Sequence, residues 1–192
     1  RVVARLRARL FGALLGQERA IATALLWADA ADNLSQRLGG LTSLLRSGHP
    51  DAAGLLEQFA QRGARHQQLV DRYFALRARF ATAAELSELL EDPRYQADQP
   101  NRVRAVFDGL VRQNLSVFYA QDGLALSRFF EELVLIDAKN AQLCARLLCL
   151  LESWSGLAEP WRERLQRAMQ ELKPKLRSSA AHEQLGRLLG TA

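Results

Sequence analysis

The stretch from residue 32 to residue 50, DNLSQRLGGLTSLLRSGHP, decides the expected fold. Its leucines recur at intervals of four, three and four residues, which places them on one face of an α-helix. These leucines are Leu34, Leu38, Leu41 and Leu45. Asp32 or Asn33 can cap the helix at its start, because each has a side-chain oxygen that accepts from a free backbone N–H. At the other end, Gly48 suits a left-handed cap and Pro50 cannot continue the helix.

The rest of the chain repeats this pattern of short, apolar-periodic segments separated by turn signals. Gly39-Gly40 is ambiguous, since the pair either lets a neighbouring helix approach closely or breaks the helix. Thr82 and Glu85 have the spacing of a capping box. A polar loop is expected over residues 92–100, and a short turn or irregular segment over residues 114–120. The other expected helices cover residues 1–16, 17–31, 51–61, 67–80, 82–90, 100–113, 123–138, 141–154, 157–172 and 179–190.

The composition supports an all-α fold. Leu occurs 36 times and Ala 30 times, whereas Ile and Val together occur 10 times, and strands favour β-branched residues. Many short helices with short loops predict an α-α superhelix, an ARM/HEAT-like two-layer array of about ten antiparallel helices. The alternative is a compact orthogonal multi-helix domain. The length of 192 residues allows one domain or at most two small ones, and we expect a single helical domain over residues 1–192.

Charge and hydropathy limit the classes of partner. The net charge is +5, but the arginines are spread along every expected helix and mixed with acidic residues, as on solvated helix faces. This distribution argues against a nucleic-acid partner, and a basic helical module for nucleic acid is the weaker alternative. No segment approaches the roughly 20 apolar residues of a membrane span, so no membrane partner is expected.

Two cysteines are too few for a disulfide framework, and free thiols in a reducing compartment are the simpler expectation. Cys144 and Cys149 are five residues apart, so on a helix they point in different directions, and both are expected to act as small core residues. The sequence begins with Arg1 rather than Met, and we expect it to be a piece of a longer chain.

Groups of catalytic residues are absent from the sequence. His182-Glu183 resembles the start of a zinc-binding helix, but Gly186 stands where the second histidine would be needed. No glycine-rich phosphate loop and no nucleophile elbow is present. We therefore expect no metal, no cofactor and no enzymatic activity from these 192 residues alone.

One polar pair stands out on the apolar segment over residues 141–154. Gln142 and Arg146 are four residues apart, so they share a face of a helix whose other residues are almost all apolar. This face is either the exposed edge of a buried helix or the lining of a channel or interface. Arg102 and Arg104, near the start of an earlier helix, point to different faces.

Six segments, in order, resemble the C-terminal helical domain of the bacterial aminopeptidase N family. In that family the corresponding segments include NPNRxRxLxxxF, FHAEDG and LDxxNPQVAARL. The likeness covers most of the chain. The matching segments here are ADNLSQRLGGL (31–41), LVDRYFALRA (69–78), QPNRVRAVFDGL (99–110), FYAQDG (118–123), LIDAKNAQLCARLL (135–148) and WRERLQRAMQEL (161–172).

The sequence also departs from the family pattern, since Leu124, Ala125 and Leu126 replace the small polar and aromatic residues that usually follow Gly123. Tyr119 and Gln121 replace the histidine and glutamate of the HAEDG stretch, and Ala141 replaces the proline that precedes the glutamine. The chain therefore resembles a divergent member of the family.

The resemblance implies a function for the whole protein. In the family, a preceding catalytic domain binds zinc through HExxH and a downstream glutamate, and the helical domain caps the active-site cavity and controls peptide access. The resemblance implies that Arg104, Gln142 and Arg146 line that cavity or channel. It also implies that the partners are the catalytic domain of the same chain and peptide substrates, in the cytoplasm. The alternative is a stand-alone HEAT-like scaffold that binds a protein in its concave groove.

Overall fold

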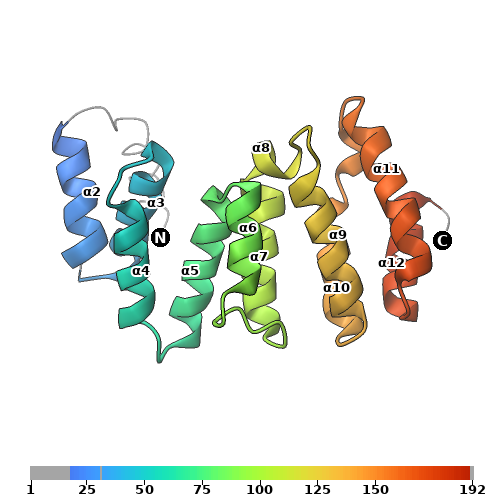
Figure 1. Cartoon of the computed structure of the whole chain (residues 1–192), viewed down its shortest axis with the longest axis horizontal. Coiled ribbons are helices and arrows are strands. Elements are labelled where there is room, and N and C mark those ends of the chain that lie inside the picture. Colours follow the sequence, from blue (N-terminus) through green and yellow to red (C-terminus); the bar gives the residue numbers. More distant parts are fainter. Residues whose placement is uncertain (1–17, 31, 191–192) are drawn as a thin grey trace. The chain divides into compact units, whose positions relative to one another are not determined.

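The computed structural model describes residues 18–30 and 32–190, and within these ranges all regular structure is helical (Figure 1). It contains eleven α-helices and three short 3₁₀ turns in that part of the chain. The helices fall into two compact units that divide between Leu76 and Arg77. The helix expected over residues 1–16 lies outside the described residues.

In the first unit, α2, α3 and α4 pack against one another. Asn33 caps α3, and its side-chain oxygen accepts a hydrogen bond from the Gln36 N–H at 2.9 Å. Gly48 ends the helix in the left-handed conformation, with φ +67°. Both ends therefore follow from the capping signals in the sequence. The helices of this unit are α2 (Glu18–Ala30), α3 (Leu34–Ser47), α4 (Ala52–Arg62) and most of α5 (Gln67–Phe80).

Gly40 brings α2 and α3 unusually close together. A Cβ atom at this position would lie 2.6 Å from both the Ala24 carbonyl oxygen and the Ala28 nitrogen. No residue with a side chain fits at that distance, so the glycine is required by the approach of the two backbones. Of the two expectations for this pair of glycines, close helix approach is confirmed and a helix break is wrong.

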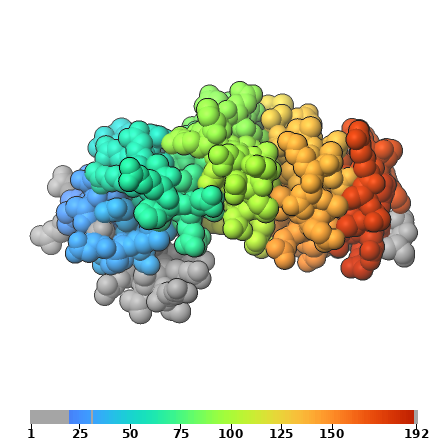
Figure 2. Space-filling model, turned by 90° about the horizontal axis from the view of Figure 1, so that it is seen from below, coloured from blue at the N-terminus to red at the C-terminus, as the bar shows by residue number. Residues whose placement is uncertain are grey.

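The second unit has two layers of helices. One layer contains α6, α9 and α11, and the other contains α7, α10 and α12, with successive long helices running in opposite directions (Figure 1). In the space-filling view, the helices of this unit follow one another side by side in chain order (Figure 2). The bounds are α6 (Ala83–Glu91), α7 (Pro100–Gln113), α8 (Leu115–Phe118), α9 (Leu124–Asp137), α10 (Ala141–Leu148), η1 (Cys149–Leu151), η2 (Trp154–Gly156), α11 (Trp161–Leu172), η3 (Lys173–Lys175) and α12 (Ser179–Leu189).

Aromatic side chains fill the space between the two layers. The Phe107 ring on α7 meets the Phe129 ring on α9 edge to face, with centroids 5.2 Å apart. The Phe118 ring lies 5.7 Å from Phe129, and all three side chains are fully buried. Burial of each ring contributes about 1.5–3 kcal/mol, and such pairs add a further ~0.5–1.5 kcal/mol.

Most expected helix boundaries are confirmed, and the capping box of α6 is present. Thr82 accepts from the Glu85 N–H, and the Glu85 carboxylate accepts from the Thr82 N–H at 2.8 Å. These bonds lower the pKa of Glu85 below its ordinary value.

The expectation of one helix over residues 141–154 is wrong. Helix α10 ends at Leu148, and the chain continues through η1 and η2. In η2, the Trp154 indole N–H donates to the Leu188 carbonyl oxygen of α12 at 3.0 Å, a tertiary contact. The next helix begins at Trp161 rather than at residue 157, because Pro160 disfavours helical geometry at the residue before it.

Candidate functional site

The three residues expected to line a cavity lie on neighbouring helices of one layer. Arg104 lies one turn into α7, and Gln142 and Arg146 lie on the first two turns of α10. Helices α7 and α10 are in contact and begin at the same end of the unit (Figure 1). The structure therefore places the three residues near the starts of two adjacent helices, and together they define the α7/α10 face.

The cations of this face have free guanidinium groups. Gln142 and Arg146 are exposed and Arg104 is half-buried. Within the described part of the chain, no hydrogen bond or ion pair involves the side chain of Arg104 or Arg146. By contrast, Arg112 on α7 lies 3.7 Å from the Asp108 carboxylate. An unpaired guanidinium at a half-buried or exposed position can bind a carboxylate through two parallel N–H donors.

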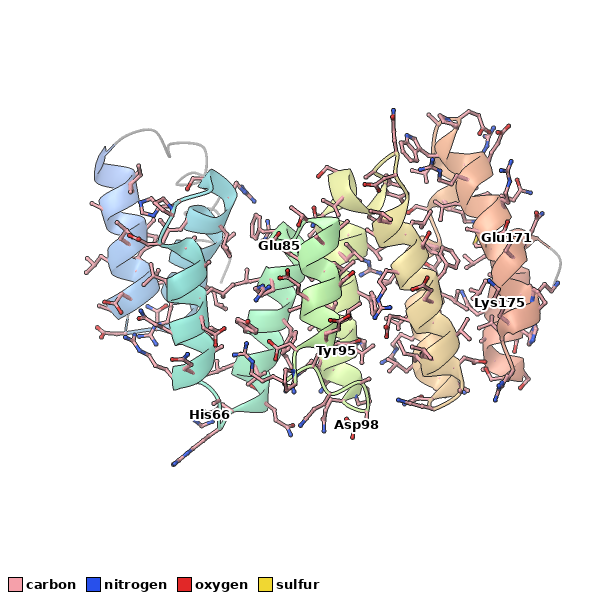
Figure 3. All side chains as sticks on the ribbon, in the orientation of Figure 1. His66, Glu85, Tyr95, Asp98, Glu171 and Lys175 are labelled. Carbon is pink, nitrogen blue, oxygen red and sulfur yellow. The ribbon has the colours of Figure 1, made fainter. Side chains whose placement is uncertain are left out.

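Arg102, two residues before Arg104, has a structural role. It is 4% exposed, and its guanidinium donates to the Arg94 carbonyl oxygen at 2.6 Å and to Gln96 Oε1 at 3.4 Å. These bonds hold the loop over residues 92–99 against the start of α7. In Figure 3, the loop residues Tyr95 and Asp98 lie at that end of the helix.

Cys149 begins η1, directly after α10 and three residues after Arg146, and η1 contacts both α7 and α10. The side chain is half-buried, so the expectation that both cysteines belong to the core is wrong for Cys149. Cys144 is fully buried, and burial raises the pKa of its thiol to about 12. Burial and the neighbouring Glu152 also raise the pKa of Cys149.

The buried acids of the second unit are occupied by structural contacts. Glu132 lies 3.1 Å from the Arg128 guanidinium, and burial raises the pKa of Glu132 although the arginine opposes this effect. Asp137 accepts from the backbone N–H groups of Arg177, at 2.6 Å, and Ser178, at 3.0 Å, and from the Ser178 hydroxyl.

No group in the described ranges has the composition of a metal site. Clusters of three or more His, Cys, Asp or Glu side chains that could hold a metal ion are absent from residues 18–30 and 32–190. His182 Nε2 lies 3.1 Å from the Leu176 carbonyl oxygen, and His49 Nδ1 accepts from the Asp51 N–H at 3.2 Å. Both contacts are local.

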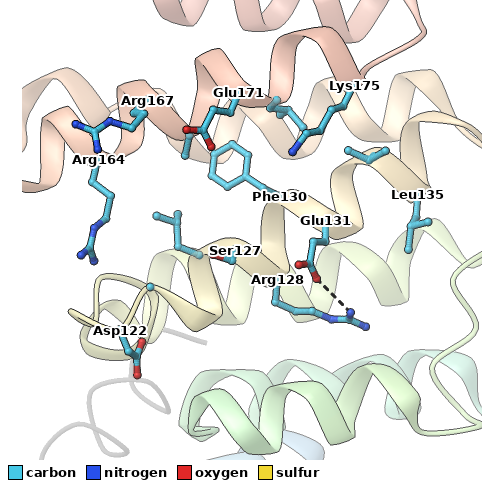
Figure 4. Close-up of a pocket in the computed structure, with 15 residues that line it drawn as sticks. Asp122, Ser127, Arg128, Phe130, Glu131, Leu135, Arg164, Arg167, Glu171 and Lys175 are labelled. Carbon is cyan, nitrogen blue, oxygen red and sulfur yellow. Dashed lines mark hydrogen bonds and ion pairs between the residues drawn. The ribbon is translucent and has the colours of Figure 1, made fainter.

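A groove of about 720 Å³ lies between α9 and α11, in the other layer (Figure 4). Apolar side chains that include Phe130, Val134 and Leu172 line its floor, and charged side chains lie along its edges. Arg164 is held in place, since it donates to the carbonyl oxygens of Ala120, at 3.0 Å, and Gln121, at 2.8 Å. The three residues expected from the sequence do not line this groove, and no pattern in the sequence indicates it.

The described helices are also too short or too polar for a membrane span: none combines the length and apolar character that crossing requires.

Comparison with known proteins identifies relatives over most of the chain. The family model described as "Domain of unknown function (DUF3458_C) ARM repeats" matches residues 5–190. Aminopeptidase N of Escherichia coli is 23% identical over 146 residues, or 74% of this chain. Aminopeptidase N of Caulobacter vibrioides is 26% identical over 128 residues, or 65% of this chain, and that of Haemophilus influenzae is 26% identical over 145 residues, or 74%. The expected likeness to bacterial aminopeptidase N is confirmed.

A solved structure shares the fold. Aminopeptidase A of Legionella pneumophila, in complex with aspartic acid, matches 98% of this chain with a TM-score of 0.88 and 17% sequence identity. This match and the family model confirm the all-α, ARM-like superhelix. The chain spans only part of its relatives: 17% of the E. coli protein, 15% of the C. vibrioides protein and 23% of the Legionella chain.

Proposed function

Because the chain belongs to the family of ARM-repeat domains described as DUF3458_C, we propose that it is the C-terminal, non-catalytic domain of a zinc-dependent aminopeptidase. In this proposal, residues 1–192 act as one helical domain that caps the active-site cavity and controls the access of peptides. The parent enzyme removes amino-terminal residues from peptides.

The observation that carries the proposal is the match to aminopeptidase N over most of this chain but less than a fifth of each relative. The larger remainder of such a protein supplies the zinc and the catalytic groups. We place the protein in the cytoplasm, where thiols such as the free Cys144 and Cys149 stay reduced.

The geometry supports a specific role for the α7/α10 face. Arg104 and Arg146 carry unpaired positive charges at the same end of two adjacent helices, with Gln142 beside them. A short peptide bound by its amino terminus at a distant catalytic centre has a free carboxylate at its other end. We assign the two arginines to the attraction of that carboxylate, and Gln142 to the lining of the same route.

The test uses the full-length enzyme with the variants Arg104→Ala and Arg146→Ala. Two substrates are compared, a tripeptide with a free carboxyl terminus and the same tripeptide as its amide. Each variant should raise KM for the free tripeptide about two- to fivefold, the range of a solvent-exposed ion pair, with little change in kcat. The amide should respond to neither substitution.

Arg112→Ala is the matched control, since Arg112 is an exposed arginine on the same helix as Arg104 but is paired with Asp108. Equal changes in KM for the acid and the amide, or no change for either, would contradict the role of the two arginines.

The main alternative is a stand-alone helical scaffold that binds a partner protein. The gene decides between the two, because the aminopeptidase proposal requires HExxH and a glutamate about 20 residues later in the same reading frame, upstream of Arg1. An independent start codon close to Arg1 would instead favour the scaffold.

A further inference from the structure

The exposed side of α11 carries a regular series of charges without ion pairs. Glu163, Arg167, Glu171 and Lys175 follow one another at intervals of four residues, with Lys175 in the turn η3 that continues the helix. All four side chains are exposed, and in the described structure none makes an ion pair. The order of charges along this stripe is negative, positive, negative, positive.

The order of charges on one copy of α11 is complementary to that on a second copy that runs in the opposite direction. If two copies of α11 pack antiparallel about a two-fold axis at position 169, each Arg167 faces Glu171 of the second copy. In the same register, each Lys175 faces Glu163 of the second copy. A two-fold axis generates every such contact twice, so one register satisfies all eight charges.

The groove beside this stripe has the shape and chemistry to receive a helix. Two large apolar side chains on α9, Leu124 (61% exposed) and Leu135 (55% exposed), lie eleven residues apart. Eleven residues are about three helical turns, or ~16 Å, so both leucines lie on one face of α9. Leu135 lines the groove, and the small Ala168 lies on its opposite wall, where a second helix can approach closely. Figure 4 shows Glu171 and Lys175 extending over Phe130 at this groove.

We propose that the α9/α11 face is a homodimer interface, in which α11 of each copy packs antiparallel beside α11 of the other and covers the groove and Leu135. Apolar contact in the groove and four reciprocal ion pairs along α11 hold the two copies together. The face lies in the α6/α9/α11 layer, whereas Arg104, Gln142 and Arg146 lie in the α7/α10/α12 layer. The dimer therefore leaves the α7/α10 face open, and it does not depend on the proposed function.

The test is charge reversal, measured as molecular mass against concentration by sedimentation equilibrium of the full-length protein. The single variants Arg167→Glu and Glu171→Arg each place like charges opposite one another twice. Each should raise the Kd of the dimer about tenfold or more. The double variant R167E/E171R restores opposite charges in the reversed order. It should return Kd to within about threefold of the unmodified protein.

Arg112→Glu is the control for net charge, since this exposed arginine lies in the other layer; it should leave Kd unchanged. Leu135→Ser should weaken the dimer without altering the charges. Circular dichroism checks that each variant keeps its helices. We expect that it does, because the substituted side chains are exposed. A protein that stays monomeric up to about 200 μM, within the micromolar range of weak interfaces, overturns the proposal. The proposal is also overturned if the single reversals leave the dimer Kd unchanged, or if the double variant does not restore it.

Discussion

A buried carboxylate, Asp137, fastens the start of the last helix to the end of α9. It is 5% exposed and accepts two backbone N–H groups and a hydroxyl from residues 177 and 178. Burial opposes the charge of Asp137, but the hydrogen bonds from Ser178 and Arg177 outweigh it and hold the pKa below its ordinary value. Asp137 therefore binds the two N–H groups just before α12, while Ser178 Oγ, which caps the helix, accepts from the Ala181 N–H in its first turn.

Asp137→Asn should lower the free energy of unfolding by about 1–3 kcal/mol at neutral pH, because the amide cannot accept all three hydrogen bonds. The folded-state pKa of Asp137 is depressed, so its contribution is present above the unfolded pKa of about 3.9 and is lost as pH falls through the folded pKa. Urea unfolding from about pH 7 to about pH 3 covers the titration of the carboxylate. The free energies of unfolding of the two proteins should converge at the acid end.

Ser178→Ala, which keeps the carboxylate and both backbone bonds, is the comparison for Asp137→Asn. It should cost less than the asparagine variant and should retain the acid dependence. Parallel curves for Asp137→Asn and the unmodified protein at every pH would show that the carboxylate makes no net contribution.

At the scale of single elements, the contact of α2 with α3 depends on one missing side chain. Gly40→Ala should destabilise the first unit by about 1–3 kcal/mol, since a Cβ at 2.6 Å from two backbone atoms forces the helices apart. The loss exceeds the roughly 1 kcal/mol that alanine gains in helix propensity.

Gly54→Ala is the matched control, because Gly54 lies within α4 and an added Cβ would meet nothing within 4 Å. This control should stabilise the protein by about 0.4–1 kcal/mol. Thermal or urea unfolding of both variants gives the comparison. If both substitutions change the free energy of unfolding equally, the effect at Gly40 comes from helix propensity and not from the contact between α2 and α3.

Helix starts could be predicted from the sequence because capping is local chemistry. Asn33, Thr82 and Ser178 each bond to an N–H three residues later, and this spacing is visible in the sequence. The end of α10 was not visible in the apolar pattern, which continues to Trp154, a residue that instead bonds to Leu188, 34 residues away. Local periodicity contains no information about such a partner.

The candidate site could be predicted only in part. Gln142 and Arg146 share an exposed face, as their spacing indicates, but their role stays a prediction. The burial of Arg102 was missed, although its position four residues before the buried Val106 was a signal for the inner face. The α9/α11 groove had no signal in the sequence, because it is formed by residues from two helices whose packing partners are not local.

At the scale of the whole molecule, the two layers of the second unit separate two surfaces of different chemistry. The α7/α10 face carries unpaired arginines, with the half-buried Cys149 three residues after Arg146, whereas the α9/α11 face carries the groove and the charge series of α11. A two-layer array makes this separation possible, since each layer covers one side of the same core.

Cys149 lets the two surfaces be distinguished in the full-length protein, because it lies three residues after Arg146, in η1, which contacts both α7 and α10. A bulky maleimide should react with Cys149 while the fully buried Cys144 stays unmodified. If the α7/α10 face lines the route of peptides, the attached group should lower kcat/KM for a tetrapeptide about tenfold, since misplacement or exclusion of a substrate costs roughly one to two orders of magnitude. The rate with a small aminoacyl anilide should stay nearly unchanged.

The Cys149→Ser variant, treated with the same reagent, accounts for modification at any other cysteine of the protein. Because the label lies outside the α9/α11 groove, it should leave the dimer intact, which the same sample tests by sedimentation. An equal loss of activity toward both substrates would instead indicate general damage to the enzyme, and full activity toward the tetrapeptide would remove the α7/α10 face from the route.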